Sequence, residues 1–524
     1  MYKFTLLFIF FLYSCASIKY PEGGPKDEIP PNIVRITPDL PKTHFQNKKI
    51  IIKFDEYIKN EDYTKEILFS PLMKSPYKVL TYGKKIKILL PNDISNEYTY
   101  LLTIKNGIKD FNEGNKLQSI LQFPFTKSQI FDTCSIEGKL ILAHPKLKLE
   151  NFFVFLYEYD SVTNQNFHDK KPLYFGIVNE KNEYKISYIK NGKYKILAVQ
   201  DKNNDFLYNE GENVGIDTVL SINMFEEPSV EWDLICFPND YQAPKIKKSY
   251  WKDSLTYSVE FNEPILKDSL IWKSSISTQA IVTDEKIDFF LPFPPKDSIK
   301  ISFFSLIDTM GNAIDTTINF SLTKTNSPNT KFQMTQPEIT PYLWIIKANY
   351  PLNEKFLSKI TIQDTSGTPL KIPLSIKNNL LIFDVSNTSL DTNQIYTIII
   401  DSTFLSYQNQ KLDSTLKFYV KPILENEFYC YLKINIETEY SNFLGILKNT
   451  QTKEVIKFKD KTHVFDRLKP GKYQLTIIND DDQNGLWTTG NLNTLKLPEK
   501  IYLFSQDIEL KPKMKIENLN IKVQ

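Results

Sequence analysis

The amino-acid sequence predicts a nearly all-β protein that is built as a string of separate domains. Aromatic residues are abundant, with 36 Phe and 29 Tyr, whereas Gly occurs only 16 times. Residues 49–54 and 84–89 are short apolar runs of strand length, and the spacing of a helical face is hard to find anywhere. A chain of 524 residues is too long for one hydrophobic core, so we expect three to five domains.

An internal repeat supports the division into domains. Residues 192–211 recur without a gap as residues 471–490, at an offset of 279 residues, and six of the twenty aligned positions are identical. Each copy is an apolar run followed by a cluster of Asp and Asn, which predicts a strand and the loop after it. Repetition at this distance indicates a string of modules rather than one large enzyme fold.

The N-terminus has the pattern of an export signal. Lys3 precedes an apolar stretch at residues 4–12, which is too short to span a bilayer. The sequence Leu12-Tyr13-Ser14-Cys15 resembles a bacterial lipobox, which implies a signal peptide at 1–14 and a diacylated Cys15 as the first mature residue. The alternative is an ordinary secretory signal that is cleaved nearby. Residues 15–29 then form a Pro- and Gly-containing tether, whose GGPKD sequence is similar to that of Bacteroidota surface-type lipoproteins.

Three segments resemble the bacterial immunoglobulin-like domain of S-layer-type proteins. Residues 30–127 (module 1) carry its Pro-Pro start, the Phe54-Asp55-Glu56 strand end and a closing Asp-x-x-x-Gly-Asn turn that begins at Asp110. Residues 241–323 (module 3) repeat the pattern around Glu263 and Asp308. Residues 330–420 (module 4) carry a weaker version, which we assign from strand spacing.

The two repeat-bearing segments lie between and after these modules. Residues 132–238 (module 2) and 425–512 (module 5) resemble transthyretin-like or collagen-adhesin B-type β-sandwiches. In many surface proteins such modules serve as spacers and stalks, so this resemblance implies a structural role. The expected architecture is therefore a linear string of Ig-like and B-type β-sandwich domains behind a lipoprotein signal peptide.

The first Asp/Asn loop is a candidate calcium site. Calcium takes six to eight hard oxygen ligands, which alternate residues of a tight loop can supply. The candidate ligands at loop positions 1, 3, 5 and 12 are Asp201, Asn203, Asp205 and Glu212. Phe206 stands where calcium loops usually have Gly, and Asn209 is only a modest ligand.

The second loop offers a different part of the ligand set. Asp480, Asp482 and Asn484 hold positions 1, 3 and 5, and Gly485 fits the tight turn, but Asn491 replaces the closing carboxylate. For both loops the alternative is that Asp and Asn cap their own backbone turns without a metal. Weak calcium is the only cofactor that the sequence suggests.

Cys134 and Cys236 flank module 2, and the sequence leaves two alternatives for them. An exported protein permits a disulfide, whereas both side chains could equally be free, buried thiols. Cys430 is left unpaired in either case.

Other function classes lack their signatures. The 64 basic and 62 acidic residues are spread along the chain, which argues against a nucleic-acid partner. No G-x-S-x-G, H-E-x-x-H, P-loop or dinucleotide motif is present, so we expect no enzyme and no small-molecule substrate.

The sequence therefore predicts a non-catalytic, lipid-anchored cell-envelope protein at the outer membrane, acting as a scaffold, an adhesin or an accessory subunit. Its expected partners are the membrane, through the anchor, and outer-membrane proteins. The alternative is a carbohydrate- or protein-binding lipoprotein of an outer-membrane transport or assembly complex. Which side of the membrane the protein faces stays open.

Overall fold

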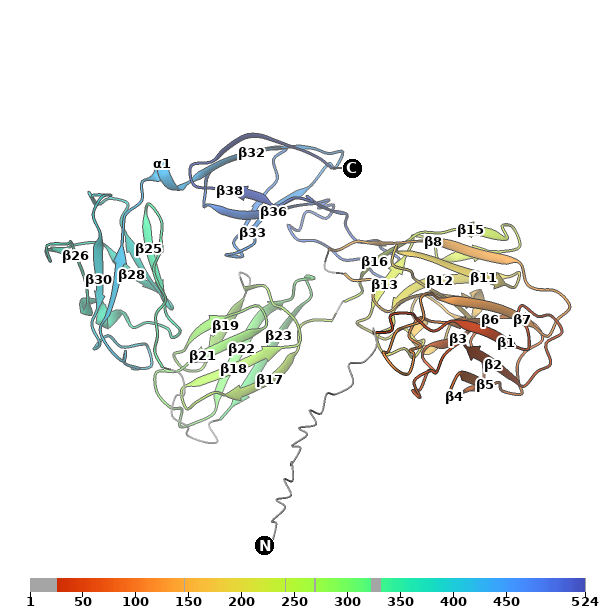
Figure 1. The fold of residues 1–524 in the computed structure, drawn as a ribbon. Helices are drawn as coiled ribbons and strands as arrows, with labels where there is room; N and C mark the ends of the chain where they lie inside the picture. The colour runs from red at the N-terminus through yellow and green to blue at the C-terminus, as the bar shows by residue number, and fades with distance from the viewer. Residues whose placement is uncertain (1–25, 146, 241, 268–269, 322–330, 524) are drawn as a thin grey trace, which may run out of the picture.

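The computed structural model describes residues 26–523 except 146, 241, 268–269 and 322–330. The predicted signal peptide, Cys15 and most of the tether lie outside the described residues. Almost every regular element is a β-strand, and the α-helical exception within the described residues is the short α1, Glu425–Phe428. Among these residues no helix has the length and hydropathy that crossing a bilayer requires. The predicted all-β string of sandwiches is confirmed (Figure 1).

Module 1 is a sandwich of two antiparallel sheets with strand orders β1-β2-β5-β4 and β3-β6-β7. Alternate side chains of Lys49–Phe54 point inward, so that Ile50, Ile52 and Phe54 are fully buried while the lysines face solvent. The strands are β1 (Ile33–Thr37), β2 (Lys49–Phe54), β3 (Ile67–Ser70), β4 (Lys78–Tyr82), β5 (Lys85–Leu89), β6 (Thr99–Ile104) and β7 (Leu121–Thr126).

Modules 3 and 4 repeat this topology. Their first sheets have the orders β17-β18-β21-β20 and β24-β25-β29-β28, and their second sheets contain β19-β22-β23 and β27-β26-β30-β31. The strands of module 3 are β17 (Ile246–Trp251), β18 (Thr256–Phe261), β19 (Ile271–Ser274), β20 (Gln279–Val282), β21 (Lys286–Phe290), β22 (Ile299–Ile307) and β23 (Ala313–Phe320). The elements of module 4 are β24 (Glu338–Ile339), β25 (Leu343–Lys347), η4 (Glu354–Lys359), β26 (Ile360–Gln363), β27 (Pro369–Leu370), β28 (Leu374–Lys377), β29 (Leu380–Asp384), β30 (Tyr396–Ile400) and β31 (Leu416–Val420).

Module 2 has a second topology, in which β8 pairs with β11 on one side and with β15 and β16 on the other. Side chains on one face of β9, such as Val154, fill the core of the module, and those on the other face, such as Phe153, join a second apolar cluster. The elements are β8 (Cys134–Leu142), β9 (Phe152–Glu158), η1 (Tyr159–Ser161), η2 (Phe167–Asp169), β10 (Tyr174–Ile177), β11 (Glu183–Ile189), β12 (Lys193–Gln200), β13 (Asn213–Ile216), β14 (Ser221–Asn223), β15 (Ser229–Glu231) and β16 (Leu234–Pro238).

Module 5 has equivalent strands, with the order β34-β33-β36-β37 matching β10-β9-β12-β13 of module 2. Its last strand, β39, pairs in parallel with β32 and lies beyond residue 512, so the predicted end of this module is too early. The core reaches Val523, which is buried. The strands are β32 (Cys430–Glu437), β33 (Leu444–Asn449), β34 (Val455–Phe458), β35 (Thr462–Leu468), β36 (Gly471–Ile478), β37 (Ile501–Leu503), β38 (Ile508–Leu510) and β39 (Lys515–Lys522).

Polar contacts join modules 1 and 2, modules 3 and 4, and modules 4 and 5. The Ser70 hydroxyl accepts the Phe175 amide between modules 1 and 2, at 3.1 Å. The Gln408 side chain donates to the Leu255 carbonyl between modules 3 and 4, at 2.7 Å. Lys469 and Glu338 form an ion pair of 2.9 Å between modules 4 and 5.

The string is not extended, because module 5 returns to module 2 (Figure 1). The Leu492 amide donates to the Asn239 side-chain oxygen at 3.2 Å, and the Thr489 hydroxyl donates to the Pro238 carbonyl. Residues equivalent by the repeat, Tyr208 and Trp487, share one buried apolar cluster. Modules 2 to 5 therefore form a closed ring, which the sequence did not predict.

Candidate functional site

The first acidic loop follows β12 directly and is organised by Asp201, which is fully buried. Its carboxylate accepts the amides of Asp205 and Phe206, at 3.2 and 2.9 Å. The Glu212 carboxylate accepts the amides of Lys202 and Asn209, at 3.2 and 3.0 Å. Burial raises the pKa of both carboxyl groups. Asp201 and Glu212, the first and last predicted ligands, thus fix the loop backbone by accepting its amides.

The two middle residues of this loop, the exposed Asn203 and the half-buried Asp205, bind each other. The Asn203 side chain donates to the Asp205 carboxylate at 2.9 Å, and the Asp205 amide donates back to the Asn203 side-chain oxygen at 3.0 Å. Asn209 also donates to the Asp205 carboxylate, at 3.3 Å. All the predicted oxygen ligands therefore lie on one loop, with Asp201 and Glu212 buried, Asp205 half-buried and Asn203 exposed.

Phe206 does not prevent the tight turn. It adopts φ 60°, close to the φ of 71° at the aligned Gly485. A side chain in this left-handed region costs about 1–2 kcal/mol. The Phe206 ring packs against Phe175 and Phe153, with centroids 4.8 and 5.4 Å apart, and this burial offsets the strain.

In the second loop three carboxylates converge. One oxygen from each of Asp480, Asp482 and Glu499 lies within 4.8 Å of the others. Asp480 is buried and accepts the Gly485 amide at 3.3 Å, whereas Asp482 is exposed and accepts the Asn484 amide at 3.1 Å. The predicted residues Asp480, Asp482 and Asn484 are thus brought together.

Glu499 is the closing carboxylate that the sequence did not identify. Asn491 occupies the aligned position and begins a turn. Its amide donates to the Lys496 carbonyl at 2.7 Å, and the Lys496 amide donates to the Asn491 carbonyl at 3.1 Å. Because of this turn, the closing acidic residue comes later in the sequence than in module 2. Glu499, and not residue 491, accepts the Thr488 amide, at 2.9 Å. Burial is the main cause that raises the pKa of Glu499, and the nearby carboxylates of Asp482 and Asp480 raise it further.

The two loops differ in their positive charge. The Lys459 ammonium binds the Asp480 carboxylate at 3.2 Å, and the Lys457 ammonium donates to the Gly485 carbonyl at 2.7 Å. By strand register, Ile177 and Phe175 hold the equivalent places in module 2. Two lysine side chains thus bind the second loop, whereas apolar side chains occupy the equivalent places beside the first loop.

Of the two alternatives for Cys134 and Cys236, the free thiols hold and the disulfide does not form. Cys236 pairs with Leu142 at the end of β8, whereas Cys134 begins the same strand. Eight residues of strand separate these ends by about 26 Å, far beyond the reach of a disulfide. All three described thiols, including Cys430, are free and buried, and burial raises their pKa values.

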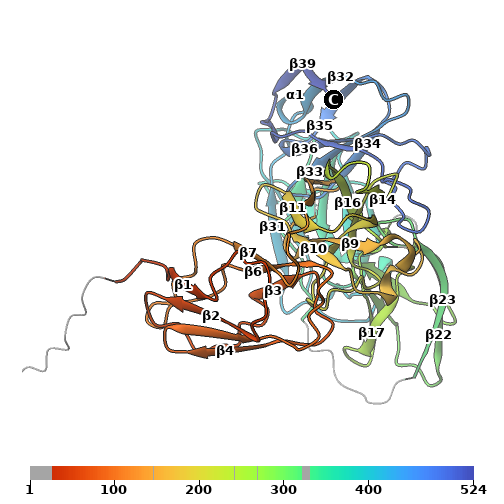
Figure 2. The ribbon, with the colours of Figure 1, turned by 90° about the vertical axis from the view of Figure 1, so that its right-hand side faces the viewer.

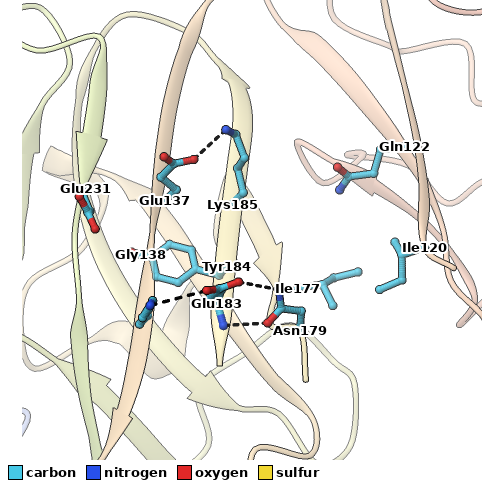
Figure 3. A pocket seen from close by; sticks show the side chains of 11 residues that line it. Ile120, Gln122, Glu137, Gly138, Ile177, Asn179, Glu183, Tyr184, Lys185 and Glu231 are labelled. Carbon is cyan, nitrogen blue, oxygen red and sulfur yellow. Dashed lines mark hydrogen bonds and ion pairs between the residues drawn. The ribbon is translucent and has the colours of Figure 1, made fainter. Parts of the chain in front are cut away.

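A pocket between modules 1 and 2 contains two ion pairs on one wall (Figure 3). On its module 2 wall, Glu137 binds Lys185 at 2.7 Å, and Glu183 binds Lys139 at 3.6 Å. Ile120 of module 1 faces these strands across the pocket. Glu231 also lines the pocket, beside these two ion pairs.

A comparison with protein families covers the N-terminal part of the chain. Residues 27–127 match the family model of the bacterial Ig-like domain. This match agrees with the predicted resemblance of module 1. A comparison with curated proteins finds no match.

Solved structures of surface proteins are similar only at low scores. The major pilin subunit of Bacillus cereus is 8% identical, with 75% of this chain and 99% of that chain covered and a TM-score of 0.14. An S-layer protein, rSbsC(31-844), is 10% identical, with coverages of 92% and 67% and a TM-score of 0.15. The Bacteroides ovatus mixed-linkage glucan utilization locus protein SGBP-B is 10% identical, with coverages of 69% and 87% and a TM-score of 0.16. We draw no functional argument from these three likenesses.

Modules 1 and 3 share a second carboxylate arrangement. Asp110 accepts three amides of its closing turn at 2.8–3.0 Å, and Asp308 accepts two at 2.7 and 2.9 Å. Glu56 and Glu263 lie beside these aspartates, and the pKa of each is raised, first by burial. For Glu263 the additional carboxylates of Asp240 and Asp308 raise the pKa to about 7.

In module 4 the same positions are neutral. The bridge between Leu352 and Ser406 corresponds to the bridge between Ile265 and Asp308. Ser406 therefore replaces the aspartate, and Tyr350 stands in place of the glutamate. The closing turn persists, because the Gln410 amide donates to the Ser406 hydroxyl at 2.9 Å. Acidic side chains are thus not required for the turn itself.

Proposed function

We propose that this protein is a non-catalytic, lipid-anchored scaffold of the outer membrane, acting as a structural or accessory subunit of the cell envelope. The Leu-x-Ser-Cys sequence that ends at Cys15 supports the anchor. The bacterial Ig-like match of residues 27–127 supports an envelope module.

The closed ring of modules carries the scaffold part of the proposal. A flexible stalk needs only linkers, whereas here Phe237, Asn239 and Leu492 of two distant modules are buried against each other. An added Cβ at Gly490 would lie 2.6 Å from the Phe237 ring, so the two modules meet at close-packed distance. Such packing fixes the relative positions of modules, which is what a scaffold requires.

Weak calcium binding at the first acidic loop is part of the same proposal. The loop carries Asp201, Asn203, Asp205 and Glu212 without the lysine that binds Asp480 in module 5, whereas the three carboxylates of module 5 lie closer to one another. Extracellular modules hold calcium with dissociation constants of about 10⁻⁴ to 10⁻³ M. The alternative of plain Asx turns is an outcome of the calcium experiment below.

Replacing Cys15 tests the anchor. In cells, the Cys15→Ala chain should carry no acyl chains by mass spectrometry, whereas the native chain should carry them and float with outer membranes in a density gradient. A native chain that is unacylated would contradict the anchor.

Affinity purification of the native chain from solubilised outer membranes tests the scaffold role, which requires defined envelope proteins to co-purify in fixed proportion. Recovery of the chain alone would contradict it.

A further inference from the structure

Three aromatic side chains stand exposed together at one end of the bacterial Ig-like domain. Tyr57, Tyr82 and Phe111 are 61%, 58% and 60% exposed. The bridge between Ile58 and Asp110, whose side chains point into the core, places Tyr57 and Phe111 side by side on the outer face. The Phe111 amide donates to the Tyr57 carbonyl at 2.8 Å, which holds the two segments together.

The ring of Tyr57 is fixed in this position. The Lys84 ammonium lies 5.3 Å from its centroid and donates to the Asp55 carbonyl at 2.6 Å. Gly83 lies beneath the ring, and an added Cβ there would be 3.5 Å from it. Tyr82 ends β4 immediately before this glycine. Tyr57 and Phe111 thus form one preformed surface, Tyr82 precedes the glycine beneath it, and we call these three residues the aromatic patch.

The aromatic patch lies at the end of module 1 opposite Thr99, and its three side chains stay exposed in the whole described chain. β6 begins at Thr99, whose amide donates to Asp132 at the module 2 end, and runs toward the Asp110 turn at the other end. Figure 2 shows the first domain projecting from the other modules, with the start of β1 at its far side. No neighbouring module therefore covers this part of the described surface.

The chain enters the domain beside the aromatic patch. The Asn115 side chain donates to the carbonyls of Asp27 and Ile29, at 2.9 and 3.3 Å, and Ile29 is itself 67% exposed. Cys15 and Lys26 are 11 positions apart in the sequence. A segment of this length spans at most about 40 Å. A lipid anchor at Cys15 would hold Lys26, where the described chain begins near the patch, within that distance of the bilayer.

We propose that the aromatic patch of Tyr57, Tyr82 and Phe111 seats in the lipid headgroup region and forms a second, non-covalent contact with the membrane. This inference rests on the proposed anchor at Cys15. Tyrosine rings favour the membrane interface because one end is apolar and the other polar. The nearby charges are mixed, with Lys59 and Lys84 beside Asp55 and Glu56, so the contact does not depend on anionic lipid. The patch sets the orientation of the ring above the bilayer.

Fluorescence quenching by brominated lipid tests the contact. The full chain is purified as the Phe111→Trp variant and reconstituted into phosphatidylcholine vesicles with or without bromine on the acyl chains. The matched control is Tyr419→Trp, which places the probe at a position that is 68% exposed on module 4. Both variants carry the same native tryptophans, so the difference between them reports the added probe.

We expect brominated lipid to remove most of the emission of the probe at position 111 and to leave that at position 419 unchanged. Adding Tyr57→Ser and Tyr82→Ser to Phe111→Trp should restore the emission, since these side chains drive the insertion. Flotation of the vesicles reports the anchor separately. A chain that does not float contradicts the anchor, whereas a chain that floats with an unquenched probe overturns the membrane contact. A blue shift of that probe with a soluble oligosaccharide, or dimerisation in detergent, would assign the patch to another occupant.

Discussion

Glu499 holds in module 5 the place that Glu212 holds in module 2. Each carboxylate accepts the amide of the residue that stands eight positions after the first aspartate of its loop. For Glu212 this residue is Asn209, at 3.0 Å, and for Glu499 it is Thr488, at 2.9 Å. The same closing interaction is thus made from two different positions in the repeat.

Calcium should stabilise the chain through the first loop alone. A ligand that binds only the folded state adds about 2.7 kcal/mol at a hundredfold excess over its dissociation constant. In module 5 the Lys459 ammonium already neutralises Asp480. Melting curves of the full chain with millimolar calcium and with chelator should therefore differ, and Asp201→Ala should abolish that difference.

Two further variants separate the loops. Asp480→Ala should keep the calcium response of the native chain, and Lys459→Met should enlarge it by freeing the second carboxylate cluster. If the native melting curves superimpose with and without calcium, both loops are Asx turns that bind no metal.

Glu263 should make the stability of the chain fall as pH rises. Its folded pKa is raised to about 7 from an ordinary value of 4.5 by burial and by Asp240 and Asp308. Between these two values the folded state binds more protons than the unfolded state, so the free energy of unfolding decreases with increasing pH. Glu263→Gln should therefore melt at a higher temperature than the native chain at pH 8, with a smaller difference at pH 5. A difference that is equal at both pH values would show that this carboxyl does not titrate as described.

Two aligned glycines should respond differently to substitution. Gly211 has φ 84° and open space around it, so Gly211→Ala introduces backbone strain of about 1–2 kcal/mol and no clash. Gly490 lies against the buried Phe237 ring, so Gly490→Ala overpacks the contact between modules 2 and 5 and costs about 1–3 kcal/mol. Both variants should lower the melting temperature, but only Gly490→Ala should increase the maximum dimension in small-angle scattering. An increase for Gly211→Ala as well would mean that ring closure does not depend on this glycine contact.

The fold could be predicted from local patterns because each module repeats its signals. The strand and loop of residues 192–211 and 471–490 appear as β12 and β36 with their loops, as expected. β39 was missed because Lys515–Lys522 is mostly exposed and rich in Lys, Glu and Asn, so its alternation is weak. A strand that is fixed chiefly by pairing with β32 carries little signal of its own.

The residues of the candidate site were predicted only where the two repeats align without a gap. Asp201, Glu212, Asp480 and Asp482 lie where the loop pattern placed them, whereas Glu499 was missed because the turn at Asn491 shifts it. Ring closure joins Asn239 to Leu492 across 253 residues, and neither residue belongs to a motif. Tertiary packing of this kind leaves no periodic trace in the sequence.

The most direct test of the closed scaffold is a spin-label distance between modules 2 and 5 in the membrane-anchored chain. Labels at Val219→Cys and Val455→Cys occupy exposed positions, and the native thiols Cys134, Cys236 and Cys430 are buried. The closed ring predicts one narrow distance distribution at the separation seen in the structure, which broadens and lengthens in Gly490→Ala. A broad distribution at long distances in the otherwise native chain would contradict ring closure and, with it, the scaffold.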